Sequence, residues 1–234
     1  MKILVAILVF AVLVAVAPPR ACAGQVIDRL VASIDAVPIL QSDWDEAVAF
    51  EALQQGRTID SVNAAERRAV LERMVDQQLL RDQLGDSQIA AAEEREISKA
   101  LDDLRKLYPA ATSDDAWRRT LAAYGLTESS LRQKIRSQIE VTRFINLRLR
   151  PESRVARADV ESYYNTTYVP EVQKRGEKPE ELAAVSQKIE EILRQQRMDT
   201  LLSNWLQDLR SHSDIRWISP APEGATETAA GEGH

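Results

Sequence analysis

Apolar residues recur every three or four positions along most of this chain, and that spacing places them on one face of an α-helix. The pattern predicts a mainly α fold with helices over residues 42–55, 63–84, 89–107, 113–124, 127–150, 158–164 and 180–211. Ser42 with Asp45, and Asn63 with Glu66, have the spacing of a capping box at a helix start. The last helix would be about 48 Å long at the usual rise per residue.

Two short segments have strand-like patterns instead. Within 26–41, β-branched and aliphatic residues dominate, and Asp35-Ala36 with Pro38 interrupts them as a turn would. Near the other end, Ile215 and Trp217 alternate with polar neighbours, as in a short edge strand. Because a short strand is not stable alone, we expect the two regions to pair and to join the ends of the chain in one module.

The first 23 residues have the pattern of a cleaved export signal. Lys2 is followed by a wholly apolar run of 15 residues, and Ala21-Cys22-Ala23 is a small-x-small cleavage site. The run is shorter than the roughly 20 residues that span a bilayer, so cleavage is favoured over anchoring, and no membrane span is expected afterwards. No aliphatic residue stands three positions before Cys22, where a lipobox usually has one, which argues against lipidation.

Polar, Pro- and Gly-containing stretches divide the rest of the chain. Residues 165–179 are expected to be a connector, and the tail over 219–234 cannot bury enough apolar surface to become ordered. We therefore expect a helical domain over 24–164, the connector, and a long helix and strand over 180–218 that pack back on that domain.

Few residues of this chain suit catalysis. Beyond residue 23 there is no cysteine, and the histidines are His212 and the terminal His234. Nucleophilic, metal and acid–base chemistry near neutral pH usually needs His, Cys or a tight carboxylate cluster. Adjacent acids such as Asp102-Asp103 point about 100° apart on a helix, which suits a solvated face better than a metal site. We expect binding rather than catalysis, with no cofactor or metal.

The charge of the chain limits its partners. The formal net charge is −6, and loss of Lys2 and Arg20 with the signal would leave 28 basic residues against 36 acidic ones, a net charge of −8. An acidic chain without clustered basic residues argues against a nucleic acid partner. The absence of cysteine beyond the signal fits an oxidising envelope compartment.

Three stretches, taken in order, resemble the N-terminal region of SurA-type periplasmic chaperones and related envelope foldases. The stretches are VIDRLVASIDAVPILQSDWD (26–45), ERRAVLERMVDQQLLRDQL (66–84), and AYGLTESSLRQKIRSQIEVTRFINLRL (123–149) followed by VARADVESYY (155–164). In that family the first is a small β element leading into a helix and the second a long core helix. The third combines a turn, a long helix and a helix ending in Tyr-Tyr. The resemblance implies a periplasmic location and a chaperone fold.

One departure from the family affects activity. In the relatives considered, the Tyr-Tyr helix leads into parvulin-type prolyl isomerase domains. Here a short connector stands between Tyr164 and a segment, 186–218, that is similar to the family's C-terminal helix and strand. A parvulin domain does not fit in that space, so the resemblance implies a chaperone core without isomerase activity.

The favoured function is therefore an ATP-independent holdase for unfolded polypeptides, outer-membrane protein precursors among them. An alternative is a non-catalytic subunit that docks on an envelope assembly through 180–211; a prolyl isomerase is the least favoured reading. If the long helix and the 113–150 segment enclose a cleft, the side chains best placed to bind clients are Trp117, Leu121, Tyr124 and Trp205. For any single aromatic among these, a place in the core is favoured over client binding, since large aromatic side chains contribute most of the burial there. The sequence leaves the oligomeric state and the clients open.

Overall fold

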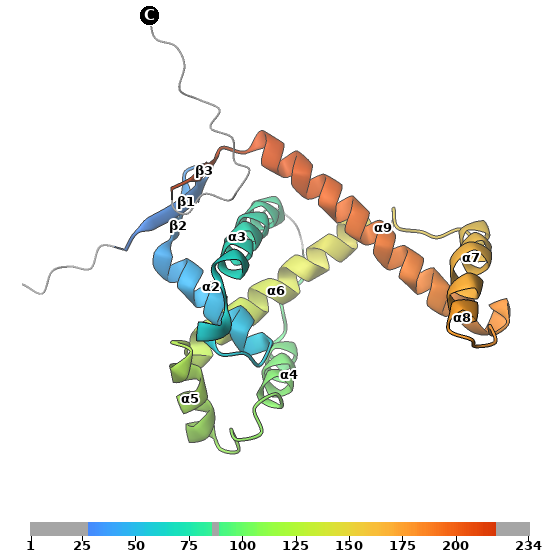
Figure 1. Ribbon diagram of the computed structural model, residues 1–234. Helices are drawn as coiled ribbons and strands as arrows, with labels where there is room; N and C mark the ends of the chain where they lie inside the picture. Colours follow the sequence, from blue (N-terminus) through green and yellow to red (C-terminus); the bar gives the residue numbers. More distant parts are fainter. Residues whose placement is uncertain (1–27, 86–88, 219–234) are drawn as a thin grey trace, which may run out of the picture.

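The computed structural model describes residues 28–85 and 89–218, so the expected signal and tail lie outside the described part. Within it, the chain is mainly α with one small sheet, as the sequence predicts (Figure 1). The strands are β1 (Leu30–Ile34), β2 (Val37–Leu40) and β3 (Ile215–Trp217). The α-helices are α2 (Gln41–Gln54), α3 (Ala64–Leu84), α4 (Glu94–Arg105), α5 (Asp114–Ala123), α6 (Glu128–Leu149), α7 (Arg157–Tyr163), α8 (Val169–Lys174) and α9 (Leu182–His212).

The sheet joins the two ends of the described chain. Its order is β2-β1-β3, and β1 pairs antiparallel with both neighbours. Between β1 and β2, Asp35 and Ala36 have φ values of 46° and 72°, and positive φ at both central residues is the geometry of a type I′ hairpin. Ala32 lies opposite Trp217 and Ile34 opposite Ile215. The predicted pairing of 26–41 with Ile215 and Trp217 is confirmed.

Local capping chemistry sets most helix starts. The Asn63 side chain accepts a hydrogen bond from Glu66 N at 3.0 Å, and the Glu66 carboxylate accepts one from Asn63 N at 2.8 Å. Arg57 also donates to Glu66, at 2.7 Å, and these hydrogen bonds, the one from Arg57 first, lower the pKa of Glu66 to about 2. Ser113 and Thr127 accept in the same way at the starts of α5 and α6. The predicted starts of these three helices are confirmed.

Three local predictions need correction. Helix α2 begins at Gln41, and Asp43, not Asp45, accepts from Leu40 N; the Ser42 hydroxyl donates to Asp28 instead of capping. Helix α4 begins at Glu94 rather than near residue 89.

The cause at α4 is a tertiary contact. Arg143 donates to the carbonyls of Ala90 and Ala91, both at 2.9 Å, and Glu140 accepts from Ala92 N at 3.1 Å. Side chains of α6 thus hold the backbone before α4 in a non-helical form. Tertiary contacts of this kind override local helix propensity.

The third correction concerns residues 165–179, which are not simply a polar connector. Helix α7 continues into a π-helical segment, η2 (Tyr164–Tyr168), and then into α8, with Pro170 in the first turn of α8 where its missing N–H costs nothing. Only η2, α8 and a short loop lie between α7 and α9. The use of 165–179 as a domain boundary stays a prediction.

Three apolar clusters form the interior. The first cluster joins the end of α2 to α4, α5 and the start of α6, and includes Leu53, Ile97 and Leu131. The second cluster joins the sheet to α2 and α3. The third cluster is small and lies between α7 and α9, where Val160 meets Val185 and Ile189.

Helix α9 crosses from the sheet to α7 and α8, and Figure 1 shows it as a long arm beside α3 and α6. Near its C-terminal end, Arg210 donates to Asp76 Oδ1 on α3 at 2.6 Å, and Leu209 packs against the second cluster. Near its middle, Arg197 donates to Asp159 on α7 at 2.6 Å. These contacts hold α9 against α3 at one end of the molecule and against α7 at the other.

Candidate functional site

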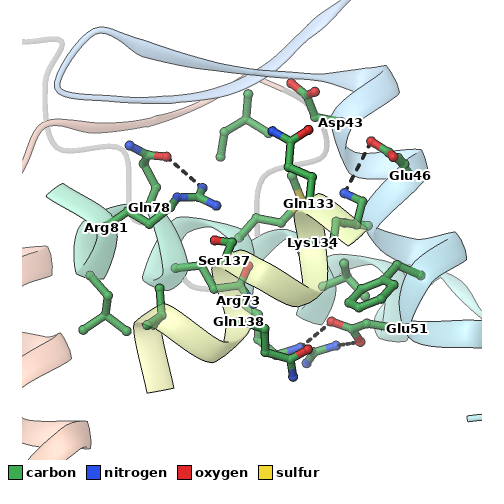
Figure 2. A pocket seen from close by; sticks show the side chains of 18 of the residues that line it. Asp43, Glu46, Glu51, Arg73, Gln78, Arg81, Gln133, Lys134, Ser137 and Gln138 are labelled. Carbon is green, nitrogen blue, oxygen red and sulfur yellow. Dashed lines mark hydrogen bonds and ion pairs between the residues drawn. The ribbon is translucent and has the colours of Figure 1, made fainter. Parts of the chain in front are cut away.

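A groove of about 1020 Å³ lies between α2, α3 and α6. Each of the three helices contributes one stripe of side chains at three- and four-residue spacing, so one face of each helix forms a wall. Figure 2 shows Gln133, Lys134, Ser137 and Gln138 on the α6 side, with Glu46 and Glu51 from α2. Residues far apart in the sequence thus share one concave surface.

Apolar side chains form part of the groove lining. The half-buried ones are Ala47, Phe50, Met74 and Ile145, and buried Val70, Leu80 and Val141 lie among them. Half-buried apolar groups lose contact with water when another chain covers them, which is favourable by roughly 25 cal/mol for each Å² covered. The groove therefore offers apolar contact area that folding has not used.

The charges at the groove are balanced and largely paired. Lys134 Nζ lies 3.3 Å from Glu46, and Arg73 Nε donates to Glu51 at 2.9 Å (Figure 2). The hydrogen bond to Glu51 raises the pKa of Arg73, so that side chain stays charged. Arg81 donates to the side-chain amide oxygen Oε1 of Gln78 at 2.8 Å. Three acids and three bases line the groove, so neither sign of charge is in surplus.

The composition of the lining agrees with a binding surface. Of the described residues around the groove, none is His or Cys. Nowhere in residues 28–85 and 89–218 do three or more His, Cys, Asp or Glu side chains group as they would around a metal ion.

A second, smaller cavity of about 350 Å³ lies between α4 and α6. Leu104, Ile135 and Ile139 give it apolar walls, and Gln54 and Gln138 line both cavities. Gln54 Nε2 donates to Gln138 Oε1 at 3.3 Å, so this amide pair stands where the two cavities adjoin.

The four side chains expected to bind clients do not come together at the groove. Trp117 and Leu121 are 4% and 1% exposed and belong to the first cluster. The Tyr124 hydroxyl donates to Arg57 O at 2.7 Å, and its ring lies edge-on to Tyr108 with centroids 6.2 Å apart. Trp117 and Leu121 thus pack in the first cluster, and Tyr124 joins the loop after α2 to the end of α5. Their role in client binding stays a prediction, and in this conformation they pack inside the fold.

Trp205 has a different environment. It is half-buried where α9 meets α6, with its ring centroid 5.6 Å from that of Phe144. The guanidinium carbon of Arg148 lies 4.6 Å from the Trp205 ring centroid, within range of a cation–π contact. The contact joins the arm to the helical body, and a part in client binding stays a prediction for this residue too.

The groove is not among the features expected from the sequence, although the polar face of α6 carries a signal for it. That face carries the uncharged Ser130, Gln133 and Ser137 at three- and four-residue spacing, with Lys134 and Gln138 directly beside them. Fully solvated helix faces are usually rich in charged residues. A stripe of amides and hydroxyls on a helix that otherwise exposes Arg and Glu was the signal that could have revealed the groove.

Comparison with known proteins matches this chain to a family model. A family model described as the SurA-like N-terminal domain matches residues 1–145. No curated protein matches the chain. The matched domain is a chaperone-type, non-catalytic module of a periplasmic family, which suggests a chaperone-like role. Within residues 28–85 and 89–218, no helix combines the length and apolar character that crossing a membrane requires.

Proposed function

We propose, because the chain belongs to the family of SurA-like N-terminal domains, that it is an ATP-independent periplasmic holdase. Its ligands would be non-native polypeptides, outer-membrane protein precursors among them. Residues 1–23 would direct its export, and no isomerase step would be involved. The observation that carries the proposal is the open groove between α2, α3 and α6, with apolar groups in its lining and balanced charges.

The groove would bind unfolded segments weakly and release them again. Apolar side chains of an unfolded segment would cover Phe50, Met74 and Ile145, which water still touches in the free protein. Each such contact is worth only a fraction of the roughly 1.5–3 kcal/mol of a fully buried side chain. Binding is then weak for any one segment but available to many, which is what competition with aggregation requires.

The alternative is a docking subunit that uses α9, and one observation favours it. Of the 31 residues of α9, only Val185 and Ile189 are buried. Met198, Leu202 and Leu206 are half-buried in its middle and C-terminal half. One stable partner of fixed stoichiometry would support this reading, whereas binding of many unrelated unfolded chains supports the holdase.

A pair of methionine variants separates the two readings. Met74→Lys places a charge in the groove, and Met198→Lys places the same charge at a half-buried position on α9. Lys can extend its ammonium to water from either position, so both variants should stay folded. We expect Met74→Lys to need roughly tenfold more protein for half-maximal suppression of client aggregation, because about 1.4 kcal/mol of apolar contact is lost.

Met198→Lys should suppress aggregation as the unchanged protein does. A prolyl-isomerisation assay on the same samples should show the uncatalysed exchange time of tens of seconds or more. Loss of suppression only in Met198→Lys would place the client surface on α9 instead of the groove. One partner bound at fixed stoichiometry, with no suppression by the unchanged protein, would favour the docking reading. Acceleration that rises with protein concentration would overturn the non-catalytic proposal.

A further inference from the structure

Side-chain amides are unusually frequent around the groove. They come from all three walls: Gln54, Gln55, Gln77, Gln78, Gln133 and Gln138. A carboxamide carries two donor hydrogens and an acceptor oxygen. It can therefore match a peptide group in either orientation, which a charged side chain cannot do.

Two of these amides are unused within the fold. Gln77 on α3 and Gln133 on α6 are exposed, and in the described part of the chain neither side chain makes a hydrogen bond. By contrast, Gln78 donates to Asp82 at 2.8 Å, and Gln54 donates to Gln138. The free amides come from different helices of the groove, and Figure 2 shows Gln133 extending over the groove from α6.

The balanced charges of the groove give no preference for a ligand of either charge. Three acids (Asp43, Glu46 and Glu51) and three bases (Arg73, Arg81 and Lys134) line the groove. Such a lining does not select a charged side chain. What it leaves available is apolar contact and amide hydrogen bonding.

Non-native chains display the matching groups. An extended segment has an N–H and a C=O at every residue except proline, whereas folded proteins pair more than about nine-tenths of their buried backbone groups internally. Free amides at an apolar groove therefore distinguish an open backbone from a folded one, whatever the side chains are.

We propose that the groove recognises the main chain of an extended polypeptide through Gln77 and Gln133. This inference rests on the proposed holdase function and specifies its ligand as backbone peptide groups. The half-buried apolar side chains beside the two amides supply contact area, and the amides supply the preference for unpaired backbone.

The test uses a fluorescent synthetic peptide of alternating Tyr and Ser, together with a copy in which every second backbone amide is an ester. The ester removes an N–H donor and weakens the acceptor while keeping every side chain. We expect the ester peptide to bind the unchanged protein roughly tenfold more weakly, since each lost hydrogen bond is worth about two- to tenfold.

The protein variants complete a double-mutant cycle. In the Gln77→Ala/Gln133→Ala protein, the amide peptide should bind roughly tenfold more weakly, and the ester replacement should have little further effect. Gln196→Ala on α9, also an exposed glutamine within a helix, should behave as the unchanged protein does. Alanine favours helix, so these variants should remain folded.

Three outcomes would contradict the inference in different ways. Equal affinity of the two peptides for the unchanged protein, or an equal ester effect in the double variant, would overturn backbone recognition and leave the holdase proposal standing. Binding of neither peptide, together with no suppression of aggregation, would overturn both.

Discussion

Deleting residues 212–234 is expected to lower the free energy of unfolding of the whole chain by about 3 kcal/mol. The deletion removes β3, the outer partner of β1, together with the contacts that Ile215 and Trp217 make with the second cluster. It also removes three hydrogen bonds to the hairpin: Asp35 N to Asp214 O at 3.1 Å, Ile218 N to Val31 O at 2.9 Å, and Asp214 N to Asp35 Oδ1 at 2.7 Å. Urea denaturation followed by circular dichroism measures the loss.

The matched control is deletion of residues 220–234 alone. That shorter deletion keeps Ile218 and every strand contact named above, so we expect no change in the unfolding midpoint. If the chain ending at residue 211 unfolds at the same urea concentration as the full chain, the joining of the chain ends contributes nothing to stability. The prediction that β3 stabilises the fold would then be wrong.

Replacing Leu121 by Ala is expected to cost about 2–5 kcal/mol of stability, the usual range for a buried leucine. Leu121 is 1% exposed and lies in the first cluster. Arg119→Ala, on the exposed face of the same helix, should change stability by no more than about 0.5 kcal/mol. Chemical denaturation and aggregation suppression are measured on the same samples, and suppression is expressed per folded molecule.

Suppression per folded Leu121→Ala molecule should equal that of the unchanged protein, because the side chain lies outside the groove lining. Trp205→Ala should lose less stability, since Trp205 is only half-buried against Phe144 and Arg148. A large fall in suppression with normal stability for either variant would instead make that residue part of a client surface.

Local chemistry explains which parts of the fold the sequence predicts well. The starts of α3, α5 and α6 follow from Asn63, Ser113 and Thr127, whose side chains accept first-turn amides in the structure as their residue types suggest. The strand pairing of the chain ends follows because short apolar strands need partners. In each case, residues close in sequence or a general need for burial determine the result.

Long-range contacts explain the parts that the sequence does not predict. The start of α4 depends on Arg143, about 50 positions away along the chain, which binds the carbonyls of Ala90 and Ala91. The groove depends on three helices meeting, and no single stripe shows which polar face lies across from another. Gln77 and Gln133 have the pattern of solvated residues until α3 and α6 are seen to line one cavity.

Cross-linking from inside the groove shows whether the groove holds an unfolded client. A chain lacking residues 1–23 has no cysteine, so Ser137→Cys on α6 and Ser203→Cys on α9 each carry one photo-activatable cross-linker. Ser137 lines the groove, and Ser203 is an exposed position on the arm. With a chemically unfolded client present, we expect strong cross-linking from position 137 and weak cross-linking from position 203. Adding the peptide of alternating Tyr and Ser should abolish the cross-linking from position 137. Equal yields at the two positions, or capture chiefly from position 203, would contradict the claim that the groove holds the client.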